Sequence, residues 1–373
     1  MAPTVQPVTT PAEREVFLRL PWRLYRGDPR WVPPLLFQQR ALLDPAQHPF
    51  HQHATVQLFL AYEGPDPLGR IAAIVNQQHI AVHQEAVGFF GFFETVPSVA
   101  VAQALLQAAA DWLRAQGMVA MRGPVNPSTN DECGLLVEGF DRPPVFMMPY
   151  NPPSYPALLE ACGLRKAKDL YAYYIHRDWV DLQRYQRLAD RLRERAGVVV
   201  RPGQMARFEA ELALVKQVYN RAWERNWGFV PMTDAEFAYL ARALKPLVVP
   251  ELVQIALVGE EPAGFALVLP DYNQVLRHLN GRLGLLGLLK FLWYRRRIST
   301  IRVMALGVVP EHRKKGIEAL MILHAWERAH RRGYQDAEVS WILEDNHLMN
   351  NTIRNLGCRH YKTYRIYEQP LTA

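Results

Sequence analysis

A basic turn between a strand and a helix is the feature of this sequence that most directly suggests chemistry. In VVPEHRKKGIEALMILHAWERA (308–329), an apolar strand ends and an amphipathic helix begins near Gly316. The first amide groups of a helix have no partner inside it, and the helix dipole adds positive charge there. With Arg313, Lys314 and Lys315 beside them, these amides suit a pyrophosphate group. A solvated basic turn would have the same sequence, so this segment alone leaves both interpretations open.

The elements that would position this turn occur twice along the chain, in the order hairpin, strand, helix, strand. In the first half we expect them at 58–75, 87–96, 101–117 and 118–121. In the second half we expect them at 253–269, 300–309, about 315–331 and 337–343. Both halves end alike, because GLRKAKDLYAY (163–173) and GCRHYKTYRIY (357–367) share Gly, Arg, Lys and Tyr at equal spacing. We therefore predict a duplicated α/β domain, with copies at 1–176 and 198–373 and a helical connector at 177–197.

The composition is that of a globular protein with an anionic partner. The 373 residues are 49% hydrophobic and 21% charged, with a net charge of +7. Three scattered cysteines without a CxxC pair, and an N-terminus without a signal-peptide pattern, predict a cytoplasmic protein without disulfides. The histidines of HPFHQH (48–53) lack metal-ligand spacing, so we expect no metal site. No nucleic-acid-binding motif is present, which disfavours that partner and leaves a phosphate-bearing cofactor or a membrane surface.

The basic turn also resembles a known motif. PEHRKKGI (310–317) is similar to the acetyl-CoA-binding motif of the GNAT acyltransferase superfamily, Arg/Gln-x-x-Gly-x-Gly/Ala. Arg313 and Gly316 match its first two fixed positions, whereas Glu318 stands where the motif has a small residue.

A second GNAT-like run follows at NHLMNNTIRNLGC (346–358), where Asn346 and Gly357 match the family pattern. Ile353 replaces a tyrosine that in this family often protonates the departing CoA thiolate. The resemblance narrows to a bacterial branch of tandem GNAT proteins that includes ceramide-synthase-like acyltransferases. It covers nearly the whole chain and is carried by GPVNPSTNDECGLL (123–136), MMPYNPP (147–153), YNRAWERNWGFVP (219–231), LPDYNQ (269–274) and SWILEDN (340–346).

This resemblance implies the fold and the place of the donor. It implies a mixed α/β fold of two GNAT-like domains, each with a central, mostly antiparallel sheet flanked by helices. The first copy has no glycine or basic cluster in its turn, so acyl-CoA or acetyl-CoA is expected only in the C-terminal copy. A backbone amide near Leu306 or Val308 would stabilise the oxyanion. The implied cofactor-binding residues are Leu306, Val308, Arg313, Lys314, Lys315, Gly316, Ile317, Asn346 and Asn350.

Acyl transfer to an amine also needs a base and a proton donor. Glu344, at the end of the strand 337–343, is the first candidate base, and Glu94 is a remoter one. Tyr361 and Tyr364 are candidate donors in place of Ile353. Most acidic residues at the end of a strand are simply exposed to solvent, so the alternative that Glu344 has no catalytic role stays open.

Two segments are expected to contact the acceptor. RGPVNPSTNDECG (122–134) leaves the predicted sheet where ligands of α/β proteins sit, and its candidate contacts are Asn126, Ser128, Asn130 and Glu132. A structural polar plug between the domains would have the same sequence. Tyr219, Trp223 and Trp227 form either a wall for the acceptor or acyl chain, or an aromatic core seam.

A short apolar run with basic residues, NGRLGLLGLLKFLWYRRRI (280–298), fits either a peripheral membrane contact or a buried helix. It is too short to span a bilayer, which needs about 20 residues.

Together these observations predict a CoA-dependent N-acyltransferase that moves an acyl group, long-chain or short, from a thioester to a small-molecule or lipid amine, with the acceptor site between the domains. The alternative is a catalytically silent protein that binds acyl-CoA or lipid on the same scaffold. An acyl-carrier protein is a further candidate donor, because its acidic surface would suit the net charge of +7.

Overall fold

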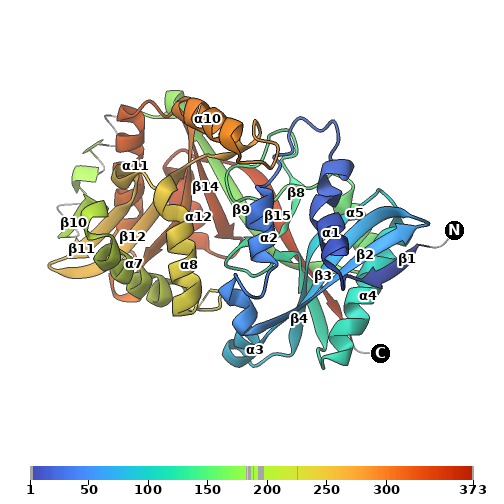
Figure 1. Ribbon diagram of the computed structural model, residues 1–373. Helices are drawn as coiled ribbons and strands as arrows, with labels where there is room; N and C mark the ends of the chain where they lie inside the picture. The colour runs from blue at the N-terminus through green and yellow to red at the C-terminus, as the bar shows by residue number, and fades with distance from the viewer. Residues whose placement is uncertain are drawn as a thin grey trace. The chain divides into compact units, whose positions relative to one another are not determined.

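The chain folds into two compact units, which Figure 1 colours along the sequence. The computed structural model describes residues 3–371 apart from 182, 184, 185, 188, 192–196 and 225. Unit 1 comprises Met1–Leu170, Leu276–Phe291 and Lys362–Ala373, and unit 2 comprises Tyr171–Val275 and Leu292–Tyr361. Relative to the predicted domains 1–176 and 198–373, three segments lie in the other packing unit: 171–176, 276–291 and 362–373. Of the predicted connector 177–197, residues 182, 184, 185, 188 and 192–196 lie outside the described residues.

Unit 1 contains a mixed sheet in the strand order β1-β2-β3-β4-β5-β15, with β8 also paired to β15. β4 and β5 pair in parallel, whereas β1–β2, β2–β3, β3–β4, β5–β15 and β8–β15 pair antiparallel. The strands are β1 (Thr4–Pro7), β2 (Ala54–Glu63), β3 (Asp66–Asn76), β4 (Val87–Thr95), β5 (Ala120–Gly123), β8 (Leu135–Glu138) and β15 (Arg359–Pro370). A separate ribbon pairs β6 (Val125–Asn126) with β7 (Glu132–Cys133). The helices are α1 (Pro11–Leu24), α2 (Leu36–Leu42), η1 (Pro49–Gln52), α3 (Gln77–His83), α4 (Val99–Ala115) and α5 (Tyr155–Ala161).

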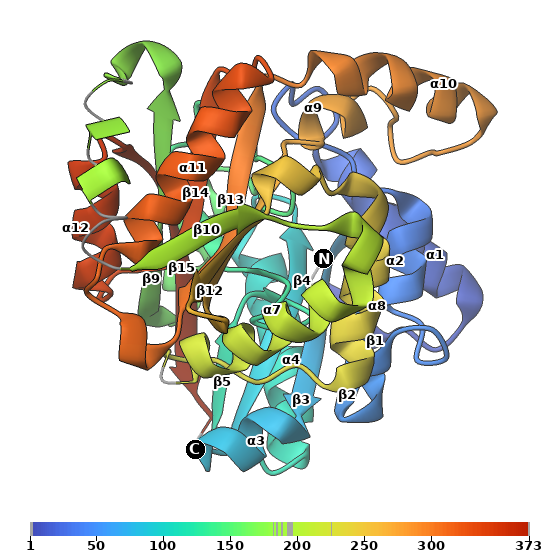
Figure 2. The same cartoon turned by 90° about the vertical axis from the view of Figure 1, so that its left-hand side faces the viewer.

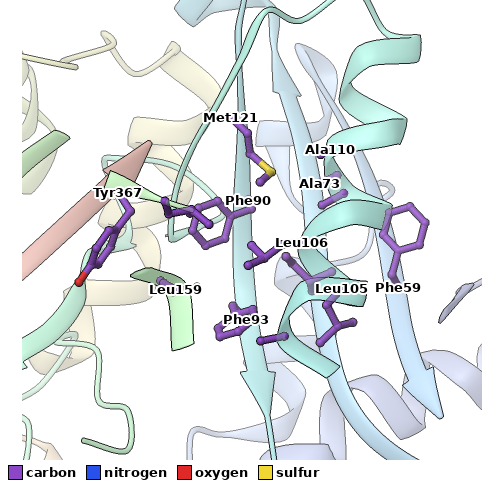
Figure 3. Close-up of a cluster of buried hydrophobic side chains, with 14 of the residues drawn as sticks. Phe59, Ala73, Phe90, Phe93, Leu105, Leu106, Ala110, Met121, Leu159 and Tyr367 are labelled. Carbon is purple, nitrogen blue, oxygen red and sulfur yellow. The ribbon is translucent and has the colours of Figure 1, made fainter. Parts of the chain in front are cut away.

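The core of unit 1 forms where α4 packs against the sheet (Figure 3). Leu105, Ala109 and Leu113, spaced at one helical turn, are buried, and Trp112 packs beside them. Removing such a stripe from water provides most of the stability of an amphipathic helix. The helix predicted at 101–117 is thus confirmed, with its first residue two positions earlier.

Unit 2 repeats this plan with the strand order β9-β14-β13-β12-β11-β10. Its strands are β9 (Arg165–His176), β10 (Val198–Pro202), β11 (Gln254–Val258), β12 (Glu261–Pro270), β13 (Thr300–Val308) and β14 (Asp336–Leu343). Its helices are η2 (Arg177–Trp179), η3 (Met205–Arg207), α7 (Phe208–Trp223), α8 (Asp234–Leu244), η4 (Lys245–Leu247), η5 (Pro250–Leu252), η6 (Arg295–Arg297), η7 (Pro310–His312), α11 (Ile317–Arg331) and α12 (His347–Asn355). The helices α9 (Asn273–Leu276) and α10 (Leu285–Tyr294) lie where the chain passes from unit 2 to unit 1 and back (Figure 2).

The two units share an irregularity at the same place. The β3–β4 register shifts between the pairs Arg70–Glu94 and Ala72–Gly91. The β12–β13 register shifts between Leu267–Ala305 and Val268–Val303, which leaves Met304 as an extra residue. A β-bulge of this kind bends the strand and interrupts its ladder. The mixed α/β fold with mostly antiparallel sheets flanked by helices is confirmed, and the matching bulges agree with a duplicated plan.

Candidate functional site

The strands β13 and β14 part in the middle of unit 2. Their parallel pairing covers Thr300–Val303 and Asp336–Val339. Both strands continue beyond this register, β13 to Val308 along β12 and β14 to Leu343. The bulge at Met304 lies directly after the last β13–β14 pair. Because a bulge bends its strand, residues 305–308, the far half of β13, turn one backbone edge away from β14. Leu306 and Val308, the predicted positions for an oxyanion contact, lie in this half.

The basic turn follows directly and leads into α11. Gly316 occupies the N-cap with a left-handed backbone (φ 79°), and no side chain caps the helix. Ile317 is the first helical residue and is fully buried. The amide groups of the first turn are therefore not capped by a side chain, which is the arrangement that binds anionic groups.

The three cations of the turn have different roles. Arg313 donates from Nε to the carbonyl of Val308 (3.3 Å) and from Nη2 to that of Ala222 (2.6 Å). Its guanidinium thus ties the turn to β13 and to α7. Lys314 and Lys315 are exposed, and Lys315 Nζ lies 3.0 Å from His312 Nδ1. The positive charge that faces solvent at this turn comes from the two lysines.

Glu318, which departs from the GNAT pattern, is half-buried in the first turn of α11. Burial raises its pKa, and the nearby charge of Arg313 lowers it in part.

Aromatic side chains from α7 pack on the same part of β13. Trp223 contacts Phe265 at 5.6 Å between ring centroids and Tyr219 at 4.7 Å. A Cβ atom placed on Gly307 would come within 2.8 Å of the Trp223 ring, so the indole lies directly on the backbone between Leu306 and Val308. Trp223 therefore lies at this strand, and Tyr219 packs beside it in the same apolar cluster.

A buried polar network lies at the parting of the strands. Glu338 and Arg302 are register partners, and Glu338 is fully buried. Its carboxylate accepts hydrogen bonds from Ser340 Oγ (2.5 Å) and from the Tyr361 hydroxyl, and Arg302 Nε donates to Ser340 Oγ (3.2 Å). Strand alternation puts this network on the face opposite α11, whose apolar residues pack with Ile301, Val303, Ala337 and Val339.

This network brings together one predicted residue, Tyr361, and three that sequence reasoning did not assign to the site. The available signal was the polar pair Glu338 and Ser340 at alternate positions of an otherwise apolar strand. Buried polar groups of this kind need partners, so their presence predicts a network.

Glu344 lies in the turn just after β14 and is half-buried. The two predicted asparagines hold α12 to this turn. Asn346 caps the helix by accepting from the Met349 amide (3.2 Å). Asn350 is buried, accepts from the Tyr173 hydroxyl (2.9 Å) and donates to the Leu343 carbonyl (3.0 Å). Both side chains thus have structural bonds in addition to any role toward a ligand.

The two candidate tyrosines separate. Tyr361 belongs to unit 2, whereas Tyr364 belongs to unit 1 and is fully buried. Glu94, the remoter candidate base, is also in unit 1, as are the four polar residues predicted to contact an acceptor.

Those four residues lie on or beside the β6–β7 ribbon. Asn126 Oδ1 accepts from the amide of Phe92 (2.6 Å), the residue at the bulge of β4. Asn126 and Glu132 are register partners. Ser128 Oγ donates to Asp131 (2.6 Å) and accepts from the Asn130 amide (3.2 Å). The strand edge of unit 1 that corresponds to the far half of β13 is therefore covered by its own chain.

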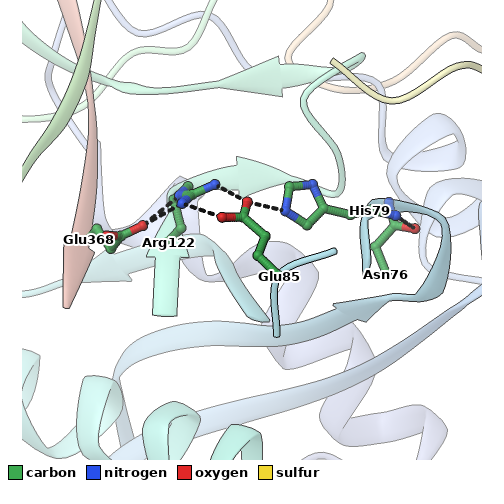
Figure 4. A network of polar contacts seen from close by, with 5 residues as sticks. All are labelled: Asn76, His79, Glu85, Arg122 and Glu368. Atoms are coloured by element: carbon green, nitrogen blue, oxygen red, sulfur yellow. Dashed lines mark hydrogen bonds and ion pairs between the residues drawn. The ribbon is translucent and has the colours of Figure 1, made fainter. Parts of the chain in front are cut away.

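A second polar network in unit 1 begins in the same segment (Figure 4). Arg122 bonds Glu85 (2.9 Å) and Glu368 (2.6 Å), and Glu85 lies 2.8 Å from His79 Nε2. Burial lowers the pKa of His79 to about 4, so this imidazole is neutral at pH 7. The network joins β5, α3 and β15 and was not predicted from the sequence.

Comparison with known proteins identifies relatives over the full length. The chain is 37% identical over 375 residues to the bacterial ceramide synthase of Caulobacter vibrioides (strain NA1000 / CB15N), covering 99% of this chain and 97% of the relative. It is 36% identical over 365 residues to Protein YghO of Escherichia coli (strain K12), covering 96% and 93%. No protein-family model matches the sequence.

Solved structures share the fold at low sequence identity. A tandem GNAT protein from the clavulanic acid biosynthesis pathway matches with a TM-score of 0.57 and 14% identity, covering 100% of this chain and 99% of that one. A GCN5-related N-acetyltransferase from Sphaerobacter thermophilus matches with a TM-score of 0.54 and 12% identity, covering 100% and 96%. The chain therefore belongs to the tandem GNAT family that includes the bacterial ceramide synthase of Caulobacter vibrioides.

Proposed function

We propose that the protein is an acyl-CoA-dependent N-acyltransferase whose donor site lies in unit 2. The observation that carries this proposal is the parting of β13 and β14 beside the uncapped N-terminus of α11. A bulged strand edge and a helix N-terminus offer two sets of backbone amides at adjacent points of one strand–turn–helix segment. The name of the Caulobacter relative supports an acyl group as the group transferred and a long-chain amine as the class of acceptor.

The residues present fit a CoA thioester. Amides of the first turn of α11, with Lys314 and Lys315, would hold the pyrophosphate. Backbone amides of β13 near Leu306 or Val308 would stabilise negative charge on the thioester carbonyl oxygen during attack. The indole of Trp223, which lies on Gly307, offers an apolar wall beside that carbonyl.

The reaction would form a C–N bond and break a C–S bond. The amine nitrogen attacks the thioester carbonyl carbon and loses one proton, and the departing thiolate gains one. Glu344 is the candidate for the first proton transfer. Tyr361 is the candidate for the second; its hydroxyl donates its single proton to Glu338 in this structure and would turn that proton toward the thiolate when the donor is bound.

Calorimetry with acetyl-CoA and palmitoyl-CoA tests the donor site. Gly316→Val places a branched side chain at the helix N-terminus, and we expect at least a tenfold loss of affinity. Gly333→Val is the matched control, because Gly333 follows the other end of α11 with a similar left-handed backbone (φ 89°) and open space around it. Both substitutions introduce similar backbone strain, so equal affinities of the two variants would show the proposed site to be wrong.

Release of free thiol with a panel of long-chain amines tests catalysis. Tyr361→Phe and Glu344→Gln should bind acyl-CoA like the wild type and release thiol at least tenfold more slowly. The alternative, a catalytically silent binding protein, is favoured by Ile353, which is fully buried where the family often has a tyrosine. Binding without thiol release for any amine would support that alternative, and competition by an acyl-carrier protein would identify a protein-bound donor.

A further inference from the structure

The helix α10 turns its apolar face outward. Leu285, Leu288, Leu289, Leu292 and Trp293 follow the i, i+3, i+4, i+7, i+8 spacing of one helical face. In a globular domain this face would point to the core. Here the exposed fractions of these side chains run from 43% at Leu292 to 78% at Leu285.

The opposite side of the helix is attached to unit 1. Phe291 packs against a cluster formed by Leu35, Leu276 and Leu279. The exposed face is therefore not the result of a detached segment, because the helix has a contact that fixes which side it presents to solvent.

The segment that carries the exposed face is basic. Six cationic residues occur between 277 and 297, and the sequence has no aspartate or glutamate between Asp271 and Glu311. Arg295, Arg296 and Arg297 follow the helix as η6 and are exposed. The Arg297 guanidinium lies 4.8 Å above the Trp293 ring, which joins the basic cluster to the apolar face.

We propose that α10 and η6 form a docking surface for an anionic lipid bilayer. At 1.5 Å per residue a ten-residue helix is about 15 Å long, too short to span a membrane but suited to lie in its interface. Among the described residues, no helix has both the length and the apolar character needed to cross a bilayer. The leucines and Trp293 would enter the acyl boundary, and the arginines would contact lipid phosphates.

Charge argues for a bilayer over a second copy of the chain. A symmetric dimer through this face would bring the same arginines from both copies together, and the segment 272–310 that carries them contains no acidic residue to pair with them. An anionic bilayer supplies the opposite charge over the whole patch. The inference does not depend on the proposed catalytic activity.

Flotation of the full-length protein with vesicles tests the proposal. We expect the protein to float with phosphatidylcholine–phosphatidylglycerol vesicles (3:1) and at least tenfold less with pure phosphatidylcholine. L289E/W293E should reduce the bound fraction at least tenfold, and R295Q/R296Q should reduce it on the anionic vesicles. Val82→Glu, at an exposed apolar position of α3, is the control and should leave binding unchanged.

Two outcomes would overturn the proposal. One is equal flotation of the wild type and L289E/W293E on anionic vesicles. The other is a dimer in light scattering that L289E/W293E converts to a monomer without any change in flotation, because the face would then bind a second copy. Circular dichroism of each variant shows whether it is folded, and L289Q/W293Q provides a second pair if the acidic variants do not fold.

Discussion

At the scale of single residues, Glu94 illustrates how the protein environment changes the pKa of a carboxyl group. Its Oε2 accepts hydrogen bonds from Tyr25 (2.8 Å) and Tyr155 (2.9 Å), and Arg70 is its register partner on β3. Removal from water raises its pKa from 4.5 to about 7, although Arg70 and both hydroxyls act in the other direction. Tyr25, Tyr155 and Arg70 are all buried, so Glu94 has structural bonds in unit 1, and its role as a base stays a prediction.

This pKa makes the stability of the fold depend on pH. Between pH 4.5 and 7 the folded state holds a proton on Glu94 that the unfolded state has released, so the contribution of Glu94 to the free energy of unfolding falls as pH rises through this window. Above pH 7 the loss is complete and amounts to between about 1 and 3 kcal/mol, allowing for partial exposure. We expect Glu94→Gln to remove this dependence. Urea unfolding of both proteins from pH 4.5 to 8 checks it, and parallel stability profiles would contradict the assignment.

The motif at the basic turn led to Gly316 and Arg313, whereas Tyr361 was a candidate only because it lies near Ile353 in the sequence. Glu338 and Arg122 were missed for a physical reason. Their partners come from strands far away in sequence, Glu338 with Tyr361 and Arg122 with Glu368, and strand pairing is not visible in a local pattern.

At the scale of elements, the β6–β7 ribbon gives the polar segment 122–134 a definite position. Asn126 bonds the amide of Phe92 at the β4 bulge. A Cβ atom on Gly91 would lie 1.7 Å from the carbonyl oxygen of Val125, so the ribbon is in close contact with β4. The sequence predicts either the wall of an acceptor site or a structural plug between the domains; these contacts fix the segment within unit 1, and its role toward an acceptor stays a prediction.

We expect Asn126→Ala to lower the free energy of unfolding by about 1–3 kcal/mol, because it leaves the amide of Phe92 without its acceptor. Asn126→Asp keeps an oxygen at the same place and should restore most of this loss. Chemical denaturation of the three proteins provides the measurement. A similar stability of the alanine variant and the wild type would show that the bond contributes little.

Most elements followed from the sequence, because hairpins and amphipathic helices have local periodicity. The predicted hairpins at 58–75 and 253–269 correspond to β2–β3 and β11–β12. The ribbon and the parting of β13 from β14 could not be predicted. Both depend on which strands pair and where the pairing ends, and this is not visible in a local sequence pattern. The segment 280–298 did form a helix, but periodicity alone did not show that its apolar face would be exposed.

At the scale of the whole molecule, the duplicated plan is asymmetric. In unit 1 the turn from β4 to α4 spans residues 96–98, and Ser98 caps the helix at the Val101 amide (3.5 Å). In unit 2 the turn from β13 to α11 spans residues 309–316 and carries two exposed lysines. In unit 1 the side chain of Ser98 thus caps α4, and the β6–β7 ribbon contacts the edge of β4. In unit 2 the N-terminus of α11 has no side-chain cap.

Hydrogen exchange can test this asymmetry along the whole chain. If the donor binds as proposed, saturating acyl-CoA should slow the exchange of the backbone amides in 305–308 and 317–320. These amides would donate hydrogen bonds to the ligand or be shielded by it from water. The corresponding amides in 91–95 and 99–102 should exchange as before, because Asn126 and Ser98 already occupy part of that site. Short labelling times separate these local effects from a general stabilisation by the ligand. Equal slowing in both copies would mean that both bind the donor, and the duplication would then be functional as well as structural.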